Sequence, residues 1–314
     1  MLIDAKAMDR DRADMIDPQG GGTLVLLNER AGALIDMGAE RLRAALASSL
    51  KNRTGHVDVR LVRPSRLKDE IERAARGDIA TLIVGGGDGS VSCAANALAG
   101  TGKTLGVLPF GTMNLFARDL GMPASIEASI DAIGSAAPRR IDLAYMNGRY
   151  FHSLSGLGFF SQMARAREEV RGHRLGRLFG VAIAAIRALR RTEPFTLDIT
   201  IEDRSEQVEA LAVLITNNRF GNDWRRPRLD DGLLEIHIAE NAGALGKLKA
   251  SANLLTGAWR NGDDSDGIRT ITARRVEIAR RRRRTFAATD GELRREHIPL
   301  RYEIRPGVLT VLSL

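Results

Sequence analysis

The chain has one cysteine, few aromatic residues and no long apolar run, and each shortage excludes a class of protein. Cys93 alone cannot form an intramolecular disulfide, which favours a reducing compartment and a cytoplasmic location. No stretch reaches about 18 consecutive apolar residues, so we expect no membrane-spanning helix. Residues 1–22 lack the apolar core of a secretory signal. The five histidines are scattered without metal-ligand spacing, which argues against a structural zinc site.

Basic residues outnumber acidic ones in this chain of 314 residues. The net charge is +8 and the isoelectric point is about 10.2. This balance favours anionic partners such as nucleotides and acidic lipid surfaces. Nucleic acid is not expected, because aromatic residues make up only 4% and no stacking platform stands out. The length predicts two domains.

Strand and helix patterns alternate through the first third of the chain. The predicted strands are Thr23–Asn28, His56–Val62, Ile79–Val84 and Thr104–Leu108, and helices are predicted at Ala33–Leu50, Arg66–Arg76 and after Gly89. This alternation predicts an α/β domain over residues 21–137, with a parallel sheet covered by helices on both faces. In such sheets ligands bind beyond the carboxyl ends of the strands.

Strands follow one another more closely from about residue 138. They are predicted at Arg140–Tyr145, Arg149–Leu154, Phe195–Glu202, Gln207–Thr216, Leu233–Ala239, Thr270–Ala279, Thr285–Thr289 and Leu300–Ile304. This pattern predicts a mostly antiparallel, β-sandwich-like domain over residues 138–299 that would hold the substrate. A helical insert is predicted at 159–191, and residues 300–314 are a candidate to complete the first domain.

The segment Gly85-Gly86-Gly87-Asp88-Gly89 follows a β-rich run and precedes a small-residue helix. Glycine has no Cβ and tolerates a positive φ, so its backbone can close on a bulky anion, and the helix N-terminus favours negative charge. A carboxylate should repel phosphate, so Asp88 indicates a Mg²⁺ ligand or a proton acceptor. On its own, the pattern is equally typical of a tight strand-to-helix turn.

A second polar loop, Pro109–Asn114, follows the next predicted strand. It presents Thr112 and Asn114 at the start of another helix. Thr112 fits an ordinary N-cap equally well. However, two polar loops at neighbouring strand ends would line one crevice, and this favours a binding site.

Four motifs in order resemble bacterial lipid kinases of the diacylglycerol kinase and sphingosine kinase-like family. They are the Asn28 turn, Gly86-Gly87-Asp88-Gly89-Ser90, the stretch from Leu108 through Asn114 to Pro123, and Asp290-Gly291-Glu292. The resemblance implies an NAD-kinase/diacylglycerol-kinase-like fold, and ATP-dependent, Mg²⁺-dependent phosphorylation of a lipid hydroxyl that would serve phospholipid biosynthesis. The implied partners are ATP, a lipid alcohol and, peripherally, the anionic inner face of the cell membrane, with a homodimer as a further hypothesis.

Site roles follow from the same resemblance. Nucleotide binding is implied for Asn28, Gly86, Gly87, Asp88, Gly89, Ser90, Gly111, Thr112, Asn114 and Glu292. Asp290 would act as general base, a role that Asp88 would share or take over. Asp290 and Glu292 would bind Mg²⁺, and Asp231 matches a structural Mg²⁺ ligand of the family. Asp290-Gly291 is also a common signal for a β-hairpin turn.

Three positions depart from the family pattern. Ser90 replaces a threonine and keeps the hydroxyl group. Leu115 stands where the family usually has aspartate, so the nucleotide wall has one carboxylate fewer. Arg228 stands where an acid would complete the site of Asp231, so we expect that metal site to be weakened or absent, with Asp231 as a turn residue.

Two basic segments suggest contact with a membrane. The stretch Arg171–Arg191 has an apolar centre between arginines, typical of an interfacial helix but equally of a core helix with solvated ends. Arg280–Arg284 is an unbroken basic run. It fits either a solvated strand edge or an attraction to anionic headgroups or ATP.

Two other functions remain open at this point. NAD kinases and phosphofructokinases share the Gly-Gly-Asp-Gly turn, so a small-molecule kinase is the close alternative. A catalytically weak, lipid-sensing relative is the second, supported by Leu115 and Arg228. A hydride-transferring dinucleotide enzyme fits poorly, because its glycine spacing is absent.

Overall fold

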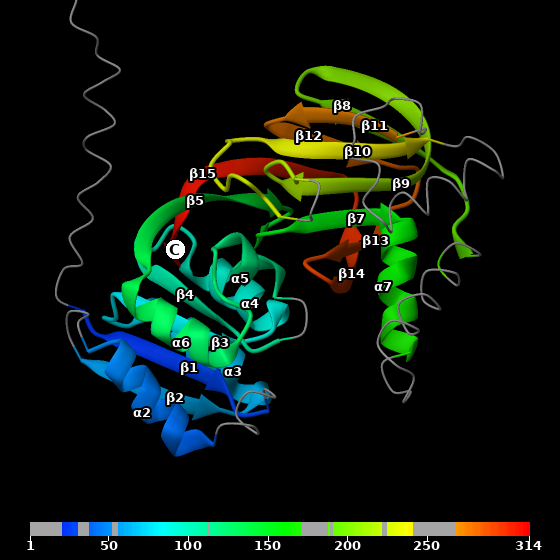
Figure 1. Ribbon diagram of the computed structural model, residues 1–314. Coiled ribbons are helices and arrows are strands. Elements are labelled where there is room, and N and C mark those ends of the chain that lie inside the picture. The colour runs from blue at the N-terminus through cyan, green and yellow to red at the C-terminus, as the bar shows by residue number, and fades with distance from the viewer. Residues whose placement is uncertain are drawn as a thin grey trace, which may run out of the picture.

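A computed structural model describes residues 21–30, 38–51, 56–111, 114–170, 188, 191–221, 225–240 and 268–314, with the backbone alone at 167–170. Its strands join into one continuous sheet (Figure 1). The first half is an α/β layer structure and the second half is mostly antiparallel, so the predicted fold class is confirmed. No helix in this part of the chain is long and apolar enough to cross a bilayer.

The α/β half has four parallel strands in the order β2–β1–β3–β4. These are β1 (Thr23–Asn28), β2 (Val57–Val62), β3 (Thr81–Gly86) and β4 (Thr104–Pro109). Every residue of β3 and β4 is buried, as expected for a parallel sheet covered on both faces. The register pairs Asn28 with Val62 and Gly86 with Pro109, so the carboxyl ends of all four strands lie along one edge.

Helices cover both faces of this sheet. The helices are α2 (Ala39–Ser49), α3 (Pro64–Arg76), α4 (Asp88–Leu98), α5 (Leu115–Asp119) and α6 (Ile126–Ser135). Helix α2 packs with α6, and α3 packs with α4 on the other side (Figure 1). Helix α3 begins at a proline, which is favourable at the first helical position. Ser125 caps α6, because its side chain accepts a hydrogen bond from the Ala128 amide at 3.2 Å.

The second half is antiparallel. It contains β5 (Ala137–Met146), β6 (Arg149–Phe151), β7 (Leu154–Gly158), α7 (Phe159–Val170), β8 (Phe195–Ile201), β9 (Arg204–Asn217), β10 (Leu234–Glu240), β11 (Ile268–Ala273), β12 (Arg275–Ala279), β13 (Arg284–Thr289), β14 (Glu292–His297) and β15 (Leu300–Ser313). A second hydrophobic core lies among these strands, separate from the core of the α/β half.

The last strand, β15, belongs to both halves. It pairs with β12 near its start and with β5 along most of its length, and it joins β4 in parallel at Thr310 and Val311. In Figure 1 it passes from the upper strands to the lower sheet. One strand therefore connects the two cores through hydrogen bonds.

Several boundaries differ from the sequence prediction. Thr270–Ala279 is two strands, because β11 pairs with β10 while β12 pairs with β8 and β15. Arg149–Leu154 contributes to two strands, β6 and β7. Strand β14 was not predicted, since its sequence ELRREH lacks apolar alternation. Most of the predicted insert 159–191 lies outside the described residues, apart from α7, Ala188 and Arg191.

Candidate functional site

The predicted five-residue glycine turn is shorter in the structure. Strand β3 runs to Gly86 and α4 begins at Asp88, so Gly87 alone joins them, with φ −90°. Positive φ is therefore not what this position requires. The close packing lies two residues earlier, at Gly85, where a Cβ would lie 2.5 Å from Cδ2 of Leu27 and 2.8 Å from the Phe110 ring.

The two polar loops pack directly against each other. A Cβ on Gly111 would lie 2.5 Å from the Cα of Gly87. The Leu115 amide, at the start of α5, donates to Oδ1 of Asp88 at 3.1 Å. The two loops at neighbouring strand ends are thus in contact, and the Asp88 side chain joins them.

Asn114 shapes the second loop from within. Its backbone is left-handed, with φ 49°. Its side-chain nitrogen donates to the carbonyl oxygens of Pro109 and Gly111, each at 2.9 Å, and its side-chain oxygen accepts from the Gly111 amide at 2.9 Å. The amide group is therefore engaged in closing the loop. Thr112 lies outside the described residues.

Asn28 and Ser90 complete the same edge. The side-chain oxygen of Asn28 accepts from the Arg30 amide at 3.0 Å, which shapes the turn after β1. The Ser90 hydroxyl lies against Gly86, where a Cβ would be only 2.7 Å from Oγ. Asn28 and Ser90 thus lie at the same edge of the parallel sheet, after β1 and after β3.

The Asp290-Gly291 segment is a hairpin turn between β13 and β14. Both residues have positive φ, 47° and 82°, as a type I′ turn requires. The Asp290 amide donates to the Leu154 carbonyl oxygen at 2.9 Å. The hairpin interpretation is confirmed, and it does not compete with a functional one because the Asp290 side chain points into the protein.

Four donors surround the Asp290 carboxylate. Its Oδ1 accepts from the amides of Ser153 at 2.9 Å and Leu154 at 3.3 Å. Its Oδ2 accepts from the His152 amide at 3.0 Å and from the Ser92 hydroxyl at 3.2 Å. The side chain is only 1% exposed. A carboxylate offers about four lone-pair positions, so Asp290 has all of them engaged.

Glu292 lies beside the first turn of α4. Its Oε1 would be 3.6 Å from a Cβ on Gly89. Its Oε2 accepts from the Arg294 guanidinium. The hairpin from the second half therefore meets α4 and the loop before it at Gly89 and Ser92.

The carboxylates differ in how well they fit a metal ion. Asp290 has no free lone pair, and Asp231 is paired with Arg228, Nε to Oδ1 at 3.1 Å. Asp88 Oδ2 and Glu292 Oε1 make no hydrogen bond within the described residues. In the same part of the chain, no three acidic, histidine or cysteine side chains form a metal-binding group. Asp88 and Glu292, each with an oxygen free of hydrogen bonds, therefore fit a divalent cation better than Asp290 or Asp231.

Several residues of the site were missed by the sequence analysis. Asn96 joins α4 to β6 through two hydrogen bonds with the Tyr150 backbone, at 2.7 and 2.8 Å. Arg226 forms a buried ion pair with Asp119, the last residue of α5, and the Arg226 amide also donates to Asp119 at 3.0 Å. His152 packs on the Phe116 ring, with centroids 4.6 Å apart. Their partners are distant in sequence, so no local motif marks them.

A further buried carboxylate, Asp142, joins two more loops. Oδ2 accepts from the Gly232 amide at 2.7 Å, and Oδ1 accepts from the Gly307 amide at 2.8 Å. Burial raises the pKa of Asp142 above its ordinary value, although these amide bonds act in the opposite direction. Asp142 thus holds the Asp231 turn and β15 against β5.

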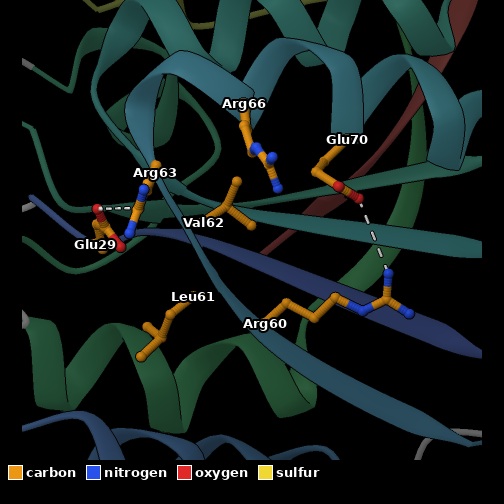
Figure 2. A pocket seen from close by; sticks show the side chains of 7 residues that line it. All are labelled: Glu29, Arg60, Leu61, Val62, Arg63, Arg66 and Glu70. Atoms are coloured by element: carbon orange, nitrogen blue, oxygen red, sulfur yellow. Dashed lines mark ion pairs between the residues drawn. The ribbon is translucent and has the colours of Figure 1, made fainter.

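A cavity of about 430 Å³ lies at the ends of β1 and β2. Its walls are Glu29, Arg60, Leu61, Val62, Arg63, Arg66 and Glu70 (Figure 2). Arg63 pairs with Glu29 and Arg60 with Glu70, whereas Arg66 has no carboxylate partner among the described residues. The cavity is on the same sheet edge as the glycine loop, because β1 pairs with β3 and β2 lies on the other side of β1.

Comparison with known proteins identifies the family. Residues 22–146 match the diacylglycerol kinase catalytic domain, and residues 160–313 match the YegS C-terminal NAD kinase beta sandwich-like domain. The chain belongs to the diacylglycerol kinase family. The resemblance seen in the four sequence motifs is thereby confirmed, and it extends over both halves of the chain.

Named relatives agree with this assignment. A diacylglycerol kinase of Staphylococcus epidermidis is 32% identical over 179 residues, covering 55% of this chain and 56% of that protein. A "Probable lipid kinase YegS-like" of Pseudomonas aeruginosa is 33% identical over 195 residues, covering 58% and 63%. The chain spans about half the length of the first curated relatives it matches. A crystal structure of a Bacillus anthracis diacylglycerol kinase has a TM-score of 0.70 at 20% identity, covering 94% of this chain and 98% of that one, which shows a common fold.

Proposed function

We propose that this protein transfers the γ-phosphoryl group of ATP to the hydroxyl group of a lipid. The observation that carries the proposal is the meeting of the two halves at α4. The Ser92 hydroxyl contacts Asp290, and Glu292 lies beside Gly89, so carboxylates of the hairpin face a glycine loop at a helix N-terminus. Phosphoryl transfer needs this combination of phosphate binding, charge neutralisation and a carboxylate near the attacking hydroxyl.

The nucleotide would lie along the carboxyl edge of the parallel sheet. Its phosphates would bind at Gly86–Gly89, where the α4 amides and dipole favour anions, with Asn28, Ser90, Gly111, Thr112 and Asn114 forming the wall. Neighbouring strands are about 4.8 Å apart, so the end of β2 is roughly 10 Å from that of β3. This span suits the nucleoside, for which the cavity at Arg63 and Arg66 has room.

Asp88 and Glu292 are the residues that would hold Mg²⁺. The ion would neutralise phosphate charge as it builds up during transfer. Leu115 contributes to the site through its amide alone: by donating to Asp88 Oδ1, it orients the carboxylate with Oδ2 free. The carboxylate that the family usually has at this position is therefore not needed to orient Asp88.

The acceptor hydroxyl would approach Asp290 through Ser92. Three of the four donors on Asp290 are backbone amides, which are fixed, whereas the Ser92 hydroxyl can rotate away. A lipid hydroxyl in its place would donate to Asp290 Oδ2 and lose its proton there. Asp88, half-buried and with a free oxygen, is the alternative proton acceptor.

A transfer assay tests this proposal. The full chain is incubated with Mg²⁺, γ-labelled ATP and, separately, diacylglycerol, ceramide, sphingosine, a polyprenol and NAD. We expect label in at least one lipid and none in NAD. Label in NAD alone would favour the small-molecule kinase, and nucleotide binding without transfer to any acceptor would favour a lipid-sensing relative. Asp88→Asn serves as the inactive control.

A further inference from the structure

The outer end of the β13–β14 hairpin carries five arginines that have no acidic partner in the part of the chain that the structure describes. Arg281, Arg282 and Arg283 lie in the loop before β13, Arg284 begins β13, and Arg295 lies on β14. All five are exposed, and none forms an ion pair with a carboxylate of the described residues. This is a concentration of positive charge that the described residues do not neutralise.

The loop that carries these arginines is fixed at both ends. The guanidinium of the preceding residue, Arg280, lies 4.4 Å from the Phe195 ring centroid, and its Nη1 donates to Thr285 Oγ1 at 3.3 Å. The Arg283 carbonyl oxygen accepts from the Ile298 amide at 3.1 Å. The arginines between these anchors are held at the surface.

An exposed aromatic ring lies among the arginines. Phe286 is 40% exposed, and among the described residues the only other exposed large apolar side chain is Leu314. Phe286 is opposite Arg295 in the ladder and two residues from Arg284, so all three share one face of the hairpin. Arg165 of α7 lies over the Phe286 ring at 4.6 Å. Figure 1 shows α7 beside these strands.

We propose that this arginine surface, formed by Arg281–Arg284, Phe286 and Arg295, docks on an anionic lipid bilayer. Uncompensated arginines attract acidic headgroups, and an aromatic ring between them can enter the interface. Protection of the β14 edge does not account for the feature, because Arg281–Arg283 lie outside the strands. A single aromatic ring offers no stacking platform for nucleic acid.

The surface lies one hairpin length from the candidate site. Strand β13 runs from Arg284 to Thr289, and its five residue steps span about 17 Å. The other end of the same hairpin carries Asp290 and Glu292. Docking of the hairpin would therefore hold the candidate site near the bilayer. This role of the surface rests on the proposed function, in which the acceptor is a lipid.

Vesicle sedimentation without ATP or acceptor tests the surface independently of catalysis. The full chain is mixed with phosphatidylcholine vesicles that contain or lack phosphatidylglycerol. We expect binding to the anionic vesicles only, weakened by added salt. Arg281→Ser/Arg282→Ser should weaken binding by about fivefold for each arginine removed. The matched control Arg41→Ser/Arg43→Ser removes the same charge from the exposed face of α2 and should leave binding nearly unchanged.

Other outcomes would overturn the proposal. Equal binding to both kinds of vesicle, or equal loss in the two double variants, would show that this surface does not dock on acidic lipid. Binding to duplex DNA but not to vesicles, with loss in Arg281→Ser/Arg282→Ser, would make the surface a nucleic-acid site. Vesicle binding without phosphoryl transfer to any lipid would support the docking surface and contradict the proposed kinase activity. Circular dichroism of each variant verifies folding.

Discussion

The Leu115 amide donates a hydrogen bond to Oδ1 of Asp88, across 27 residues of chain. This contact fixes the orientation of the Asp88 carboxylate and joins the two loops at the ends of β3 and β4. Because the donor is a backbone amide, it does not depend on the identity of the side chain at position 115. Leucine in place of the aspartate that the family usually has at position 115 therefore leaves the orientation of the Asp88 carboxylate unchanged.

Replacing Asp88 by asparagine should separate chemistry from structure. The asparagine oxygen can still accept from Leu115, so the free energy of unfolding should change by less than about 0.5 kcal/mol. The charge is lost, so kcat should fall on the order of a hundredfold or more. Urea denaturation and steady-state kinetics measure the two quantities. An unchanged kcat would show that Asp88 does not take part in phosphoryl transfer.

The packing of Gly87 against Gly111 should be intolerant of a single methyl group. Gly111→Ala places a Cβ 2.5 Å from the Gly87 Cα and 2.7 Å from Asn114 Oδ1, so the two loops must separate. We expect a loss of about 1–3 kcal/mol in stability and weaker ATP binding by calorimetry. Gly77→Ala is the control, because its Cβ would meet nothing closer than 3.6 Å. Equal effects of the two variants would contradict the close packing.

Asp290 and Ser92 should respond differently to substitution. Asp290→Asn puts an amide nitrogen where one oxygen accepts hydrogen bonds, leaving two donors unpaired, so both stability and kcat should fall, stability by about 2 kcal/mol or more. Ser92→Ala removes one bond and should cost about 1 kcal/mol while leaving kcat nearly unchanged. An unchanged kcat in the Asp290→Asn variant would show that Asp290 is not the general base. A large loss of kcat in Ser92→Ala would show that Ser92 does more than occupy the acceptor position.

The buried Arg226–Asp119 pair should be strongly coupled. Arg226→Met leaves the Asp119 charge, 2% exposed, without its cation and should cost about 3–5 kcal/mol. Arg226→Met/Asp119→Leu should recover part of that loss. In contrast, Arg301→Met breaks the exposed pair with Glu277 and should cost at most about 1 kcal/mol. Chemical denaturation of the variants measures the coupling, and additive losses would argue against it.

Asp142 should make the stability depend on pH with an unusual sign. Burial raises its pKa in the folded state above the ordinary 3.8, so the folded protein holds this proton more tightly than the unfolded chain. The contribution is therefore present at low pH and is lost as the pH rises through the raised pKa. The unfolding free energy of the wild type, minus that of Asp142→Asn, should fall as the pH rises above 3.8. A rise would show that the amide bonds outweigh burial.

The sequence predicted those parts of the molecule that depend on local pattern. Alternating apolar segments indicated the parallel sheet, and the ordered motifs indicated the family. Strand β14 escaped prediction because an edge strand with charged residues has no apolar period. Three other features could not be predicted from the sequence for a different reason. They are the four donors around Asp290, the Arg226–Asp119 pair and the cavity at Arg66. Each is assembled from segments far apart in the chain, and only the tertiary structure brings them together.

The position of β15 has a consequence for how the protein is made. Its fourteen residues are synthesised after β4, β5 and β12, yet they pair with all three strands. While the ribosome still holds these residues, β4 and β5 each lack a neighbour, and an open strand edge invites pairing with other chains. The nascent chain therefore cannot complete either core until β15 has left the ribosome, and the pairing of β15 becomes a late event in folding.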